Sequence, residues 1–348
     1  MSDAHTASRL HVSTDDLAKL IREFGLGEVV ARRHLADGLM NVNWRLDTPT
    51  GPFVLKRVTD VPLDRLRRNL AVLPALAEVG IPLVAPVKAS SGDVVVEVGG
   101  SGYCVFPWAS GSHVRGVDLP RAQVGRLGAE LAKLHVALQR AVGSGTLPAL
   151  PDTVPANVTT PERAEQKANR LASAARTHAV EDSFDAIALD ALNRRRTLLA
   201  LYASLRPAGN VPTGPHGWTH GDFQYRNLLW DGGELTAVLD WDRLGARPYA
   251  EEVIRTAQVQ FGVEGVFDLE RVAAFVSGYR SVVPLEPAAL LDAARRLWWK
   301  RMTNFWQLEF HYDRDDHSCD DLFIADEALL HWWTERLDRV ERTFGDAL

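Results

Sequence analysis

Two short segments in the second half of the chain hold side chains whose types and spacing could do chemistry. The first is residues 220–227, HGDFQYRN, and the second is residues 240–242, DWD. Asp222 offers a carboxylate that can accept a proton from a hydroxyl group, and Asn227 and Asp240 offer oxygens of the kind that Mg²⁺ prefers. A base, an amide ligand and an acidic ligand in this order are what phosphoryl transfer from a nucleotide requires.

The spacing between the segments predicts a β-hairpin that brings the two metal ligands together. Residues 227–230 read as a strand, 231–233 (Asp-Gly-Gly) as a turn, and 235–239 as the returning strand. Folding at this turn places Asn227 and Asp240 at the same open end of the hairpin, within about two strand residues of roughly 3.3 Å each. Both side chains could then share one cation.

The pattern His-Gly-Asp-x4-Asn followed by Asp-Trp resembles that of the aminoglycoside phosphotransferase family, which also includes choline and homoserine kinases. The alternative, loop residues beside a plain turn, is disfavoured because four positions match at the family's spacing. The resemblance implies an α+β, two-lobed protein-kinase-like fold, with a small antiparallel β-sheet N-lobe and a mostly helical C-lobe. It places these lobes at 1–107 and 117–348, joined by a linker at 108–116.

The nucleotide side of such a site is also recognisable upstream. Lys56 stands in the apolar strand 53–58, which resembles the strand whose lysine binds nucleotide phosphates in kinase-like folds. Gly38 and Asn41 lie in a segment similar to the family's nucleotide-covering turn. The chain has no Gly-x-Gly-x-x-Gly and no Walker A sequence, which disfavours a P-loop enzyme.

The linker also resembles its family counterpart, whose backbone groups contact the base. Phe106 and Trp108 are therefore candidate nucleotide-binding residues, with ATP and GTP equally open. His220 is expected to brace the catalytic loop, and Arg226 to meet the transferring phosphoryl group or to pair with an acid.

The chain departs from the family pattern in two places. Asn69, on a helix expected at 63–79, stands where the family has a glutamate that pairs with the lysine. Either Asp64 or Glu78 replaces it, or Lys56 is held by phosphate alone. After Pro248, Glu251 or Glu252 stands in for an aspartate that braces the catalytic loop. His135, on a helix expected from Pro120, is expected to be a buried structural histidine rather than a catalytic one.

Composition limits the possible partners. The chain has 348 residues, enough for two lobes, and 46% of them are hydrophobic. Its 39 basic and 45 acidic residues give a net charge of −6, which opposes a nucleic-acid partner. Cys104 and Cys319 have no metal or redox spacing. With no apolar run of spanning length and no leader pattern, we expect a cytoplasmic monomer or homodimer without a membrane partner.

The C-terminal part is expected to be helical, with helices over about 161–178 and 182–205 before a long tail. Half of the ten tryptophans stand in this tail, and their helical spacing favours a packed core over a platform that stacks a ring-shaped substrate. Residues 309–321 form a charged run, best interpreted as solvated surface. Its other interpretations are an acidic rim that attracts a cationic acceptor and a zinc site from His311, His317 and Cys319, although that spacing is not an established one.

We therefore expect a kinase that uses Mg²⁺ and ATP or GTP to phosphorylate a hydroxyl of a small acceptor. An antibiotic-like acceptor, such as an aminoglycoside, another aminosugar or a nucleoside, is the first hypothesis. A metabolic kinase for choline, homoserine or a sugar is the alternative. A nucleotide-binding pseudokinase is a third, opposed by an intact Asp222, Asn227 and Asp240. The resemblance leaves the acceptor open, because the acceptor pocket is built by the least recognisable parts of the chain.

Overall fold

A computed structural model describes the chain over residues 12–35, 41–178 and 183–345. It separates into two compact units, each described here on its own. Unit 1 comprises Met1–Val114, Val136–Leu150 and Trp218–Gly245, and unit 2 comprises Arg115–His135, Pro151–Gly217 and Ala246–Leu348. The lobe boundaries expected from the sequence stay a prediction, because these units group segments by contact and not by order along the chain.

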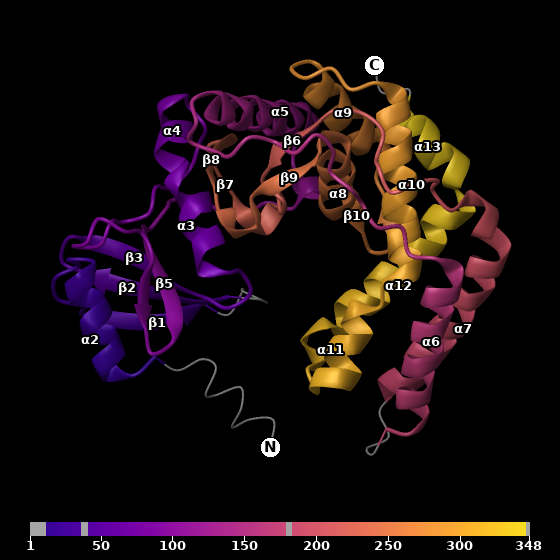
Figure 1. Cartoon of the computed structure of the whole chain (residues 1–348), viewed down its shortest axis with the longest axis horizontal. Helices are drawn as coiled ribbons and strands as arrows, with labels where there is room; N and C mark the ends of the chain where they lie inside the picture. Colours follow the sequence, from indigo (N-terminus) through magenta and orange to yellow (C-terminus); the bar gives the residue numbers. More distant parts are fainter. Residues whose placement is uncertain (1–11, 36–40, 179–182, 346–348) are drawn as a thin grey trace. The chain divides into compact units, whose positions relative to one another are not determined.

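A five-stranded antiparallel sheet forms the first part of unit 1 (Figure 1). Its strands are β1 (Ala31–Leu35), β2 (Val42–Thr48), β3 (Gly51–Val58), β4 (Val96–Val98) and β5 (Ser101–Pro107), in the order β1-β2-β3-β5-β4. Strand β2 alternates strictly between buried and half-buried residues, as expected for a strand with one face on a core. Lys56 pairs with Asn43 on β2 and with Cys104 on β5, so it sits on the central strand.

Helix α2 (Thr14–Glu23) covers one face of this sheet (Figure 1). Ser13 caps its first turn by accepting a hydrogen bond from the Asp16 amide at 3.0 Å. Leu20 and Phe24 then pack in a cluster with Trp44, Leu55 and other strand residues. This apolar layer holds the strand that carries Lys56 in place.

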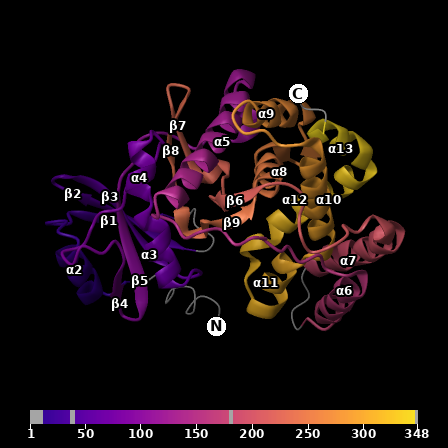
Figure 2. The same cartoon turned by 45° about the horizontal axis from the view of Figure 1, so that its top comes forward.

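The helix expected at 63–79 is broken in two. Helix α3 (Leu63–Ala71) ends before Val72, and α4 (Leu73–Glu78) starts after it. Pro74 explains the break, because its ring nitrogen has no hydrogen to donate to the carbonyl four residues earlier. Figure 2 shows α3 and α4 in sequence, with the β7–β8 hairpin of the same unit beside α4.

That hairpin forms as the sequence predicts. A 3-10 turn, η3 (Tyr225–Asn227), leads into β7 (Leu228–Asp231), and β8 (Glu234–Val238) returns antiparallel to it. Gly232 and Gly233 have φ angles of 54° and 86°, the pair of left-handed conformations that a tight two-residue hairpin requires. The difference from expectation is that Asn227 ends the 3-10 turn instead of starting the strand.

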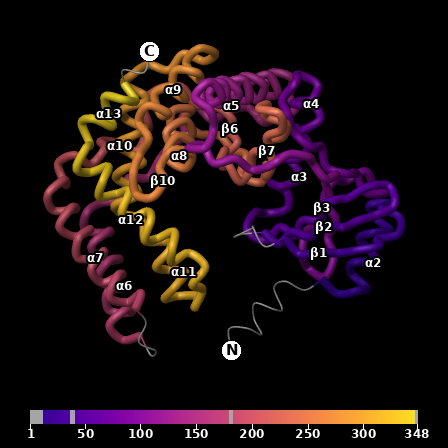
Figure 3. Tube along the Cα trace, turned by 180° about the vertical axis from the view of Figure 1, so that it is seen from behind, coloured from indigo at the N-terminus to yellow at the C-terminus, as the bar shows by residue number. Residues whose placement is uncertain are grey.

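Unit 2 is mostly helical (Figure 3). Helix α5 (Arg121–Gly143) is divided between the two units at His135. The helices that follow it are α6 (Pro161–Arg176), α7 (Ser183–Tyr202), α8 (Tyr249–Phe261), α9 (Leu269–Arg280), α10 (Pro287–Thr303), α11 (Trp306–Arg314), α12 (Asp320–Glu335) and α13 (Leu337–Gly345). The described chain also contains two short two-stranded sheets. One pairs β6 (His216–Thr219) with β9 (Gly245–Pro248), and the other pairs β10 (Gly262–Val263) with β11 (Val266–Phe267).

Tryptophans form much of the core of unit 2. Trp298 and Trp299 on α10 and Trp333 on α12 are each at most 1% exposed. The indole of Trp298 also donates a hydrogen bond to the Thr334 hydroxyl at 2.9 Å. The prediction that the aromatic residues of the tail serve packing is therefore confirmed for these three. Trp306 and Trp332 are half-buried.

Candidate active site

The loop after β6 is braced by a fully buried histidine. His220 is 0% exposed, and its Nε2 lies 3.0 Å from the Leu239 carbonyl oxygen. Its Nδ1 lies 3.2 Å from the Asp222 amide. A carbonyl accepts and an amide donates, so these partners define a neutral ring with its hydrogen on Nε2. His220 thus joins the loop to the end of β8, which is the bracing geometry expected of it.

The carboxylate of Asp222 is oriented by two amide side chains. Its Oδ2 accepts from Gln224 Nε2 at 2.8 Å and from Asn227 Nδ2 at 3.0 Å. Asn227 Nδ2 also donates to the Asp222 carbonyl at 2.9 Å. The nitrogen of the Asn227 amide is thereby committed to the loop, so its oxygen is the atom that could bind a cation.

Asp240 follows β8 in a rare backbone conformation. Its φ of 60° and ψ of 66° are left-handed, a region that few residues other than glycine and the short polar Asp and Asn adopt. The amide of the preceding Leu239 donates to the Asn227 carbonyl at 2.8 Å. Asn227 and Asp240 therefore flank the same end of the hairpin, as predicted. Such strained positions are concentrated at functional sites.

The left-handed turn lets two acids reach one lysine. Lys56 Nζ lies 2.7 Å from Asp240 Oδ1 and 2.6 Å from Asp242 Oδ2, and the lysine side chain is 9% exposed. Burial disfavours the ammonium, but the charges of Asp240 and Asp242 outweigh this effect and raise the pKa of Lys56. The same lysine lowers the pKa of Asp240 despite its burial. Lys56 and Asp240 are therefore both charged in this structure.

Asp242 is the site residue to which the sequence analysis gave no role. It is 1% exposed, and its Oδ2 also accepts from Asn41 Nδ2 at 2.9 Å. Burial, opposed by Lys56 and reinforced by the charge of Asp240, raises the pKa of Asp242 to about 6. Its Oδ1 has no hydrogen-bond partner among the described residues. Asp242 was detectable as the acid nearest to Asp240, since a lysine without its helical glutamate needs another counter-ion.

Asn69 supports Asp242 from behind instead of contacting the lysine. Its Nδ2 donates to the carbonyls of Asp242 at 2.8 Å and Leu244 at 3.2 Å, and it is fully buried. The suggestion that Asp64 or Glu78 pairs with Lys56 is wrong, because both side chains are exposed and the lysine's acids come from the Asp240 turn. Asn69 therefore shapes the segment that supplies the counter-ion.

A second buried network lies within unit 2. Glu252 Oε2 lies 2.6 Å from His135 Nε2, and the Tyr279 hydroxyl lies 2.7 Å from His135 Nδ1. All three residues are at most 4% exposed. His135 is thus a buried structural histidine, as expected. Glu252 binds this histidine, and the bracing of the catalytic loop by Glu251 or Glu252 stays a prediction.

The remaining residues assigned to the nucleotide stay predictions. Gly38 lies outside the described residues. The Trp108 amide donates to the Pro52 carbonyl at 3.0 Å, so this amide is already used within the sheet. Phe106 is half-buried on β5. Arg226 is exposed, and its Nε donates to the Tyr225 hydroxyl at 3.1 Å.

The charged run at 309–321 contains ion pairs. On α11, Glu309 lies 2.7 Å from Lys167, and Asp313 receives two hydrogen bonds from Arg170 at 2.7 and 3.0 Å. Both bases belong to α6, which packs beside α11. This pairing favours ordinary solvated surface over an acidic rim.

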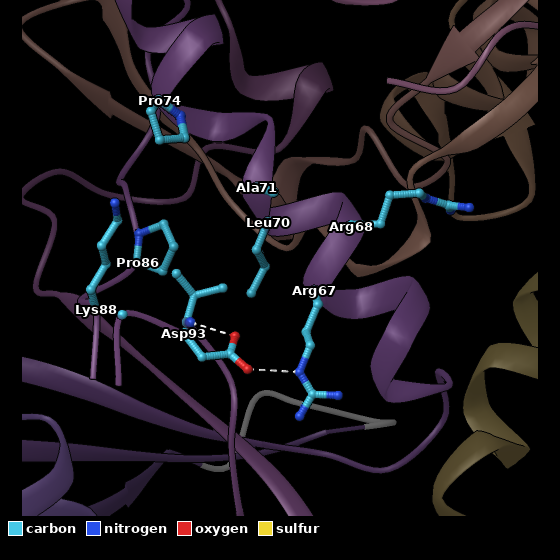
Figure 4. Close-up of a pocket in the computed structure, with 10 residues that line it drawn as sticks. Arg67, Arg68, Leu70, Ala71, Pro74, Pro86, Lys88 and Asp93 are labelled. Carbon is cyan, nitrogen blue, oxygen red and sulfur yellow. Dashed lines mark hydrogen bonds and ion pairs between the residues drawn. The ribbon is translucent and has the colours of Figure 1, made fainter. Parts of the chain in front are cut away.

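A surface recess of about 460 Å³ lies elsewhere in unit 1 (Figure 4). It is formed by α3, the start of α4 and residues 86–94, and Arg67 Nε bonds Asp93 there at 2.9 Å. Arg67 also pairs with Glu97 at 2.7 Å. None of the residues assigned to phosphoryl transfer lines this recess, so it is separate from the candidate active site.

The chain is a phosphotransferase that acts on hydroxyl groups, as its family membership shows. The chain belongs to the phosphotransferase enzyme family, whose model matches residues 32–285. Curated relatives include a homoserine kinase of Methylobacillus flagellatus, 25% identical over 85% of this chain and 86% of that protein. A homoserine kinase of Methylocella silvestris is 30% identical over 80% of this chain and 79% of its own length.

Solved structures show the same fold. Spectinomycin phosphotransferase, in complex with ADP and spectinomycin, superposes with a TM-score of 0.62 and 14% identity, covering 97% of this chain and 99% of that one. An amicoumacin kinase in complex with AMP-PNP and Ca²⁺ superposes with a TM-score of 0.58 and 16% identity, covering 97% and 95%. The expected α+β, protein-kinase-like fold is confirmed. No helix in the described ranges is long and apolar enough to cross a membrane.

Proposed function

We propose that this chain transfers the terminal phosphoryl group of ATP or GTP to a hydroxyl group of a small acceptor, with an antibiotic-like aminosugar or nucleoside as the first candidate. The observation that carries the proposal is the position of Lys56 between Asp240 and Asp242, at 2.7 and 2.6 Å. A buried lysine held by acids at the end of a hairpin is suited to bind phosphates beside a metal. The Asp222 loop precedes the same hairpin and supplies the base.

The residues at the hairpin end suit a magnesium ion. Asp240 and Asn227 offer one carboxylate and one amide oxygen, and Mg²⁺ takes few protein ligands of this kind beside phosphate and water. The buried Oδ1 of Asp242 has no hydrogen-bond partner among the described residues, which indicates that a bound group supplies one. When bound, the ion neutralises charge on the nucleotide phosphates. Asn227 and Asp240 would hold it.

Each remaining residue has a defined task in this scheme. Asp222, oriented by Gln224 and Asn227, accepts the proton of the acceptor hydroxyl as that oxygen bonds to phosphorus. Lys56 turns from Asp240 toward the phosphates while Asp242 retains its charge nearby. His220 keeps the loop attached to β8.

The nucleotide itself would meet a different set of residues. Gly38 and Asn41 would cover its phosphates, and Phe106 and Trp108 would line the base. The hydrogen bond from Asn41 to Asp242 connects this covering segment to the lysine site. Arg226 is exposed next to the catalytic loop and would approach the transferring group.

Two classes of hydroxyl-bearing acceptor are the main candidates. An antibiotic-like aminosugar or nucleoside is the class expected from the sequence motif, and proteins of similar fold include a spectinomycin phosphotransferase and an amicoumacin kinase. Homoserine is the second candidate, favoured by homoserine kinases that match 80–87% of this chain at 25–30% identity. Choline and sugars are further members of a screen.

The test is an acceptor screen with the purified protein. Aminoglycosides, nucleosides, homoserine and choline are each incubated with Mg²⁺ and with ATP or GTP, and phosphate incorporation is read by mass. We expect a mass gain of one phosphate on one acceptor class, lost in Asp222→Asn. Nucleotide binding without transfer to any acceptor, unchanged by Asp222→Asn, would instead indicate a pseudokinase.

A further inference from the structure

Five metal-ligating side chains gather in unit 2, apart from the residues of the proposed reaction. They come from the residues just after α6, the start of α7, helix α11, the short turn that follows it and the start of α12, and α11 lies beside α6 in Figures 1 and 3. Two overlapping groups each have ligand atoms within 4.8 Å of one another, namely His178, Asp185 and His311, and His311, His317 and Asp320. His311 belongs to both groups.

The second group has the dimensions of a coordination shell. His311 Nδ1 lies 3.1 Å from His317 Nδ1 and 3.0 Å from Asp320 Oδ2, and His317 Nδ1 lies 3.4 Å from the same oxygen. Ligand atoms about 2.0–2.1 Å from a tetrahedral zinc ion lie roughly 3.3–3.4 Å from one another. Three donors from a single local segment thus already converge at nearly that spacing.

Hydrogen bonding within the group does not account for it fully. His311 Nδ1 has both Asp320 oxygens at 3.0 Å and a second imidazole nitrogen at 3.1 Å, yet it carries one hydrogen at most. The His311 side chain is 0% exposed, and its Nε2 has no hydrogen-bond partner among the described residues. A cation bound at Nδ1 explains this arrangement better than hydrogen bonds do, because it can accept the lone pairs of all the atoms that meet there.

We propose that His311, His317 and Asp320 bind a zinc ion, or a divalent transition metal of similar preference, through His311 Nδ1, His317 Nδ1 and Asp320 Oδ2. Two imidazoles and one carboxylate are zinc-type ligands, whereas Mg²⁺ prefers oxygen alone. The site is therefore chemically distinct from the Asn227 and Asp240 pair. Water completes the fourth position, and the 47% exposed side chain of His317 provides a route of entry.

Asp185 and His178 form the outer layer of this site. Metal-binding histidines commonly give their second ring N–H to a carboxylate. Asp185 is held in place by the Tyr312 hydroxyl at 2.8 Å and by His178 Nδ1 at 3.2 Å, within 4.8 Å of a His311 ring nitrogen. With metal on Nδ1, the hydrogen of His311 stays on Nε2, the ring nitrogen that has no hydrogen-bond partner among the described residues. The ion would tie α11 and α12 to the α6–α7 pair.

The structure corrects the composition of the zinc site considered from the sequence. His311 and His317 come together, but Cys319 belongs to neither group in the described part of the chain. Its sulfur contacts the Ser318 hydroxyl at 3.8 Å. Asp320, which begins α12, takes the third position.

The test uses the full chain, stripped of metal with a chelator and kept free of nucleotide. Zinc binding is titrated calorimetrically, and Co²⁺ serves as a visible probe of four-coordinate geometry. His317→Ala and Asp320→Asn remove ligands at exposed or half-buried positions, and Asp321→Asn is the matched control because it removes the same charge one residue further on. Asp240→Asn controls for zinc bound at the nucleotide site.

We expect one zinc ion per chain in wild type, in Asp321→Asn and in Asp240→Asn. His317→Ala and Asp320→Asn should each bind zinc at least about tenfold more weakly, since mutating even a residue that supports a metal ligand costs about 10–100-fold in metal affinity. Both variants should also lose the four-coordinate Co²⁺ spectrum. Circular dichroism confirms that the variants are folded. Absence of saturable zinc binding in wild type, or equal affinity in wild type and both ligand variants, overturns the proposal.

Discussion

The ammonium of Lys56 lies 2.6 Å from a carboxylate oxygen of Asp242, and this pair sets the electrostatics of the candidate site. Asp242 replaces the helical glutamate that kinase-like folds use to pair with the lysine, and Asn69 secures its backbone. In the proposed function, Asp240 has a second task, because it would exchange Lys56 for a metal ion when nucleotide binds. Asp242 would then keep neutralising Lys56.

The raised pKa of Asp242 predicts a pH-dependent stability. Since that pKa is about 6 in the folded chain and 3.8 ordinarily, the folded state takes up a proton between these values that the unfolded chain does not. The unfolding free energy of wild type should therefore rise, relative to Asp242→Asn, as pH falls from about 7 to 4. At about 1.36 kcal/mol per pKa unit, the relative change is of order 1–3 kcal/mol. Urea unfolding at several pH values measures it.

The comparison with Asp242→Asn removes this one carboxyl and keeps Asp240, whose lowered pKa contributes with the opposite sign at lower pH. Asp231→Asn, at the exposed end of β7, is the matched control for the loss of one carboxylate. Parallel profiles for wild type and Asp242→Asn would show that Asp242 is not a proton-binding group in this range.

Asp240→Asn should weaken binding of Mg²⁺-nucleotide by at least about 100-fold, because loss of even an outer-shell partner costs 10–100-fold. Binding of nucleotide without metal should change far less, because Lys56 is released from Asp240 for the phosphates. A fluorescent nucleotide titrated with and without Mg²⁺ separates the two effects. If Asp240→Asn and Asp231→Asn bound Mg²⁺-nucleotide equally well, Asp240 would not be a metal ligand.

Asp222→Asn should lower kcat by about 10²–10⁴, typical for loss of a general base. The asparagine keeps an oxygen that can accept from Gln224 and Asn227, so the loop geometry and the affinity for nucleotide should persist. Steady-state kinetics with the acceptor found in the screen, together with nucleotide titration, checks both statements. A kcat equal to that of wild type would remove Asp222 from the mechanism.

The parts of the site that the sequence predicts are those encoded locally. The hairpin follows from Gly232 and Gly233, whose left-handed turn fixes which residues share the open end. The proposed metal ligands Asn227 and Asp240 flank the open end of that hairpin, so their approach needs no long-range information. The bracing by His220 is equally local, across 19 positions to Leu239.

The role of Asp242 depends on features that residue patterns do not carry. Lys56 and Asp240 are 184 positions apart, and the pairing of both acids with the lysine requires the left-handed backbone at Asp240. In unit 2, His178 and Asp185 likewise lie close to His311, more than a hundred positions later. Sequence patterns predict contacts within one element, whereas contacts between segments far apart in the sequence depend on how the elements pack.

Two glycines on one face of α5 give the last prediction. A Cβ on Gly128 would lie 2.0 Å from the Phe275 carbonyl oxygen of α9, whereas one on Gly125 would meet its nearest neighbour, the Ala274 carbonyl oxygen, at 3.6 Å. A backbone oxygen cannot move aside as the end of a flexible side chain can. Gly128→Ala should therefore lower the free energy of unfolding by at least about 1–3 kcal/mol. Gly125→Ala should instead stabilise by about 0.5–1 kcal/mol through helix propensity. Thermal and urea unfolding of the two variants measures the contrast, and equal stabilities would mean that α5 and α9 do not approach this closely in solution.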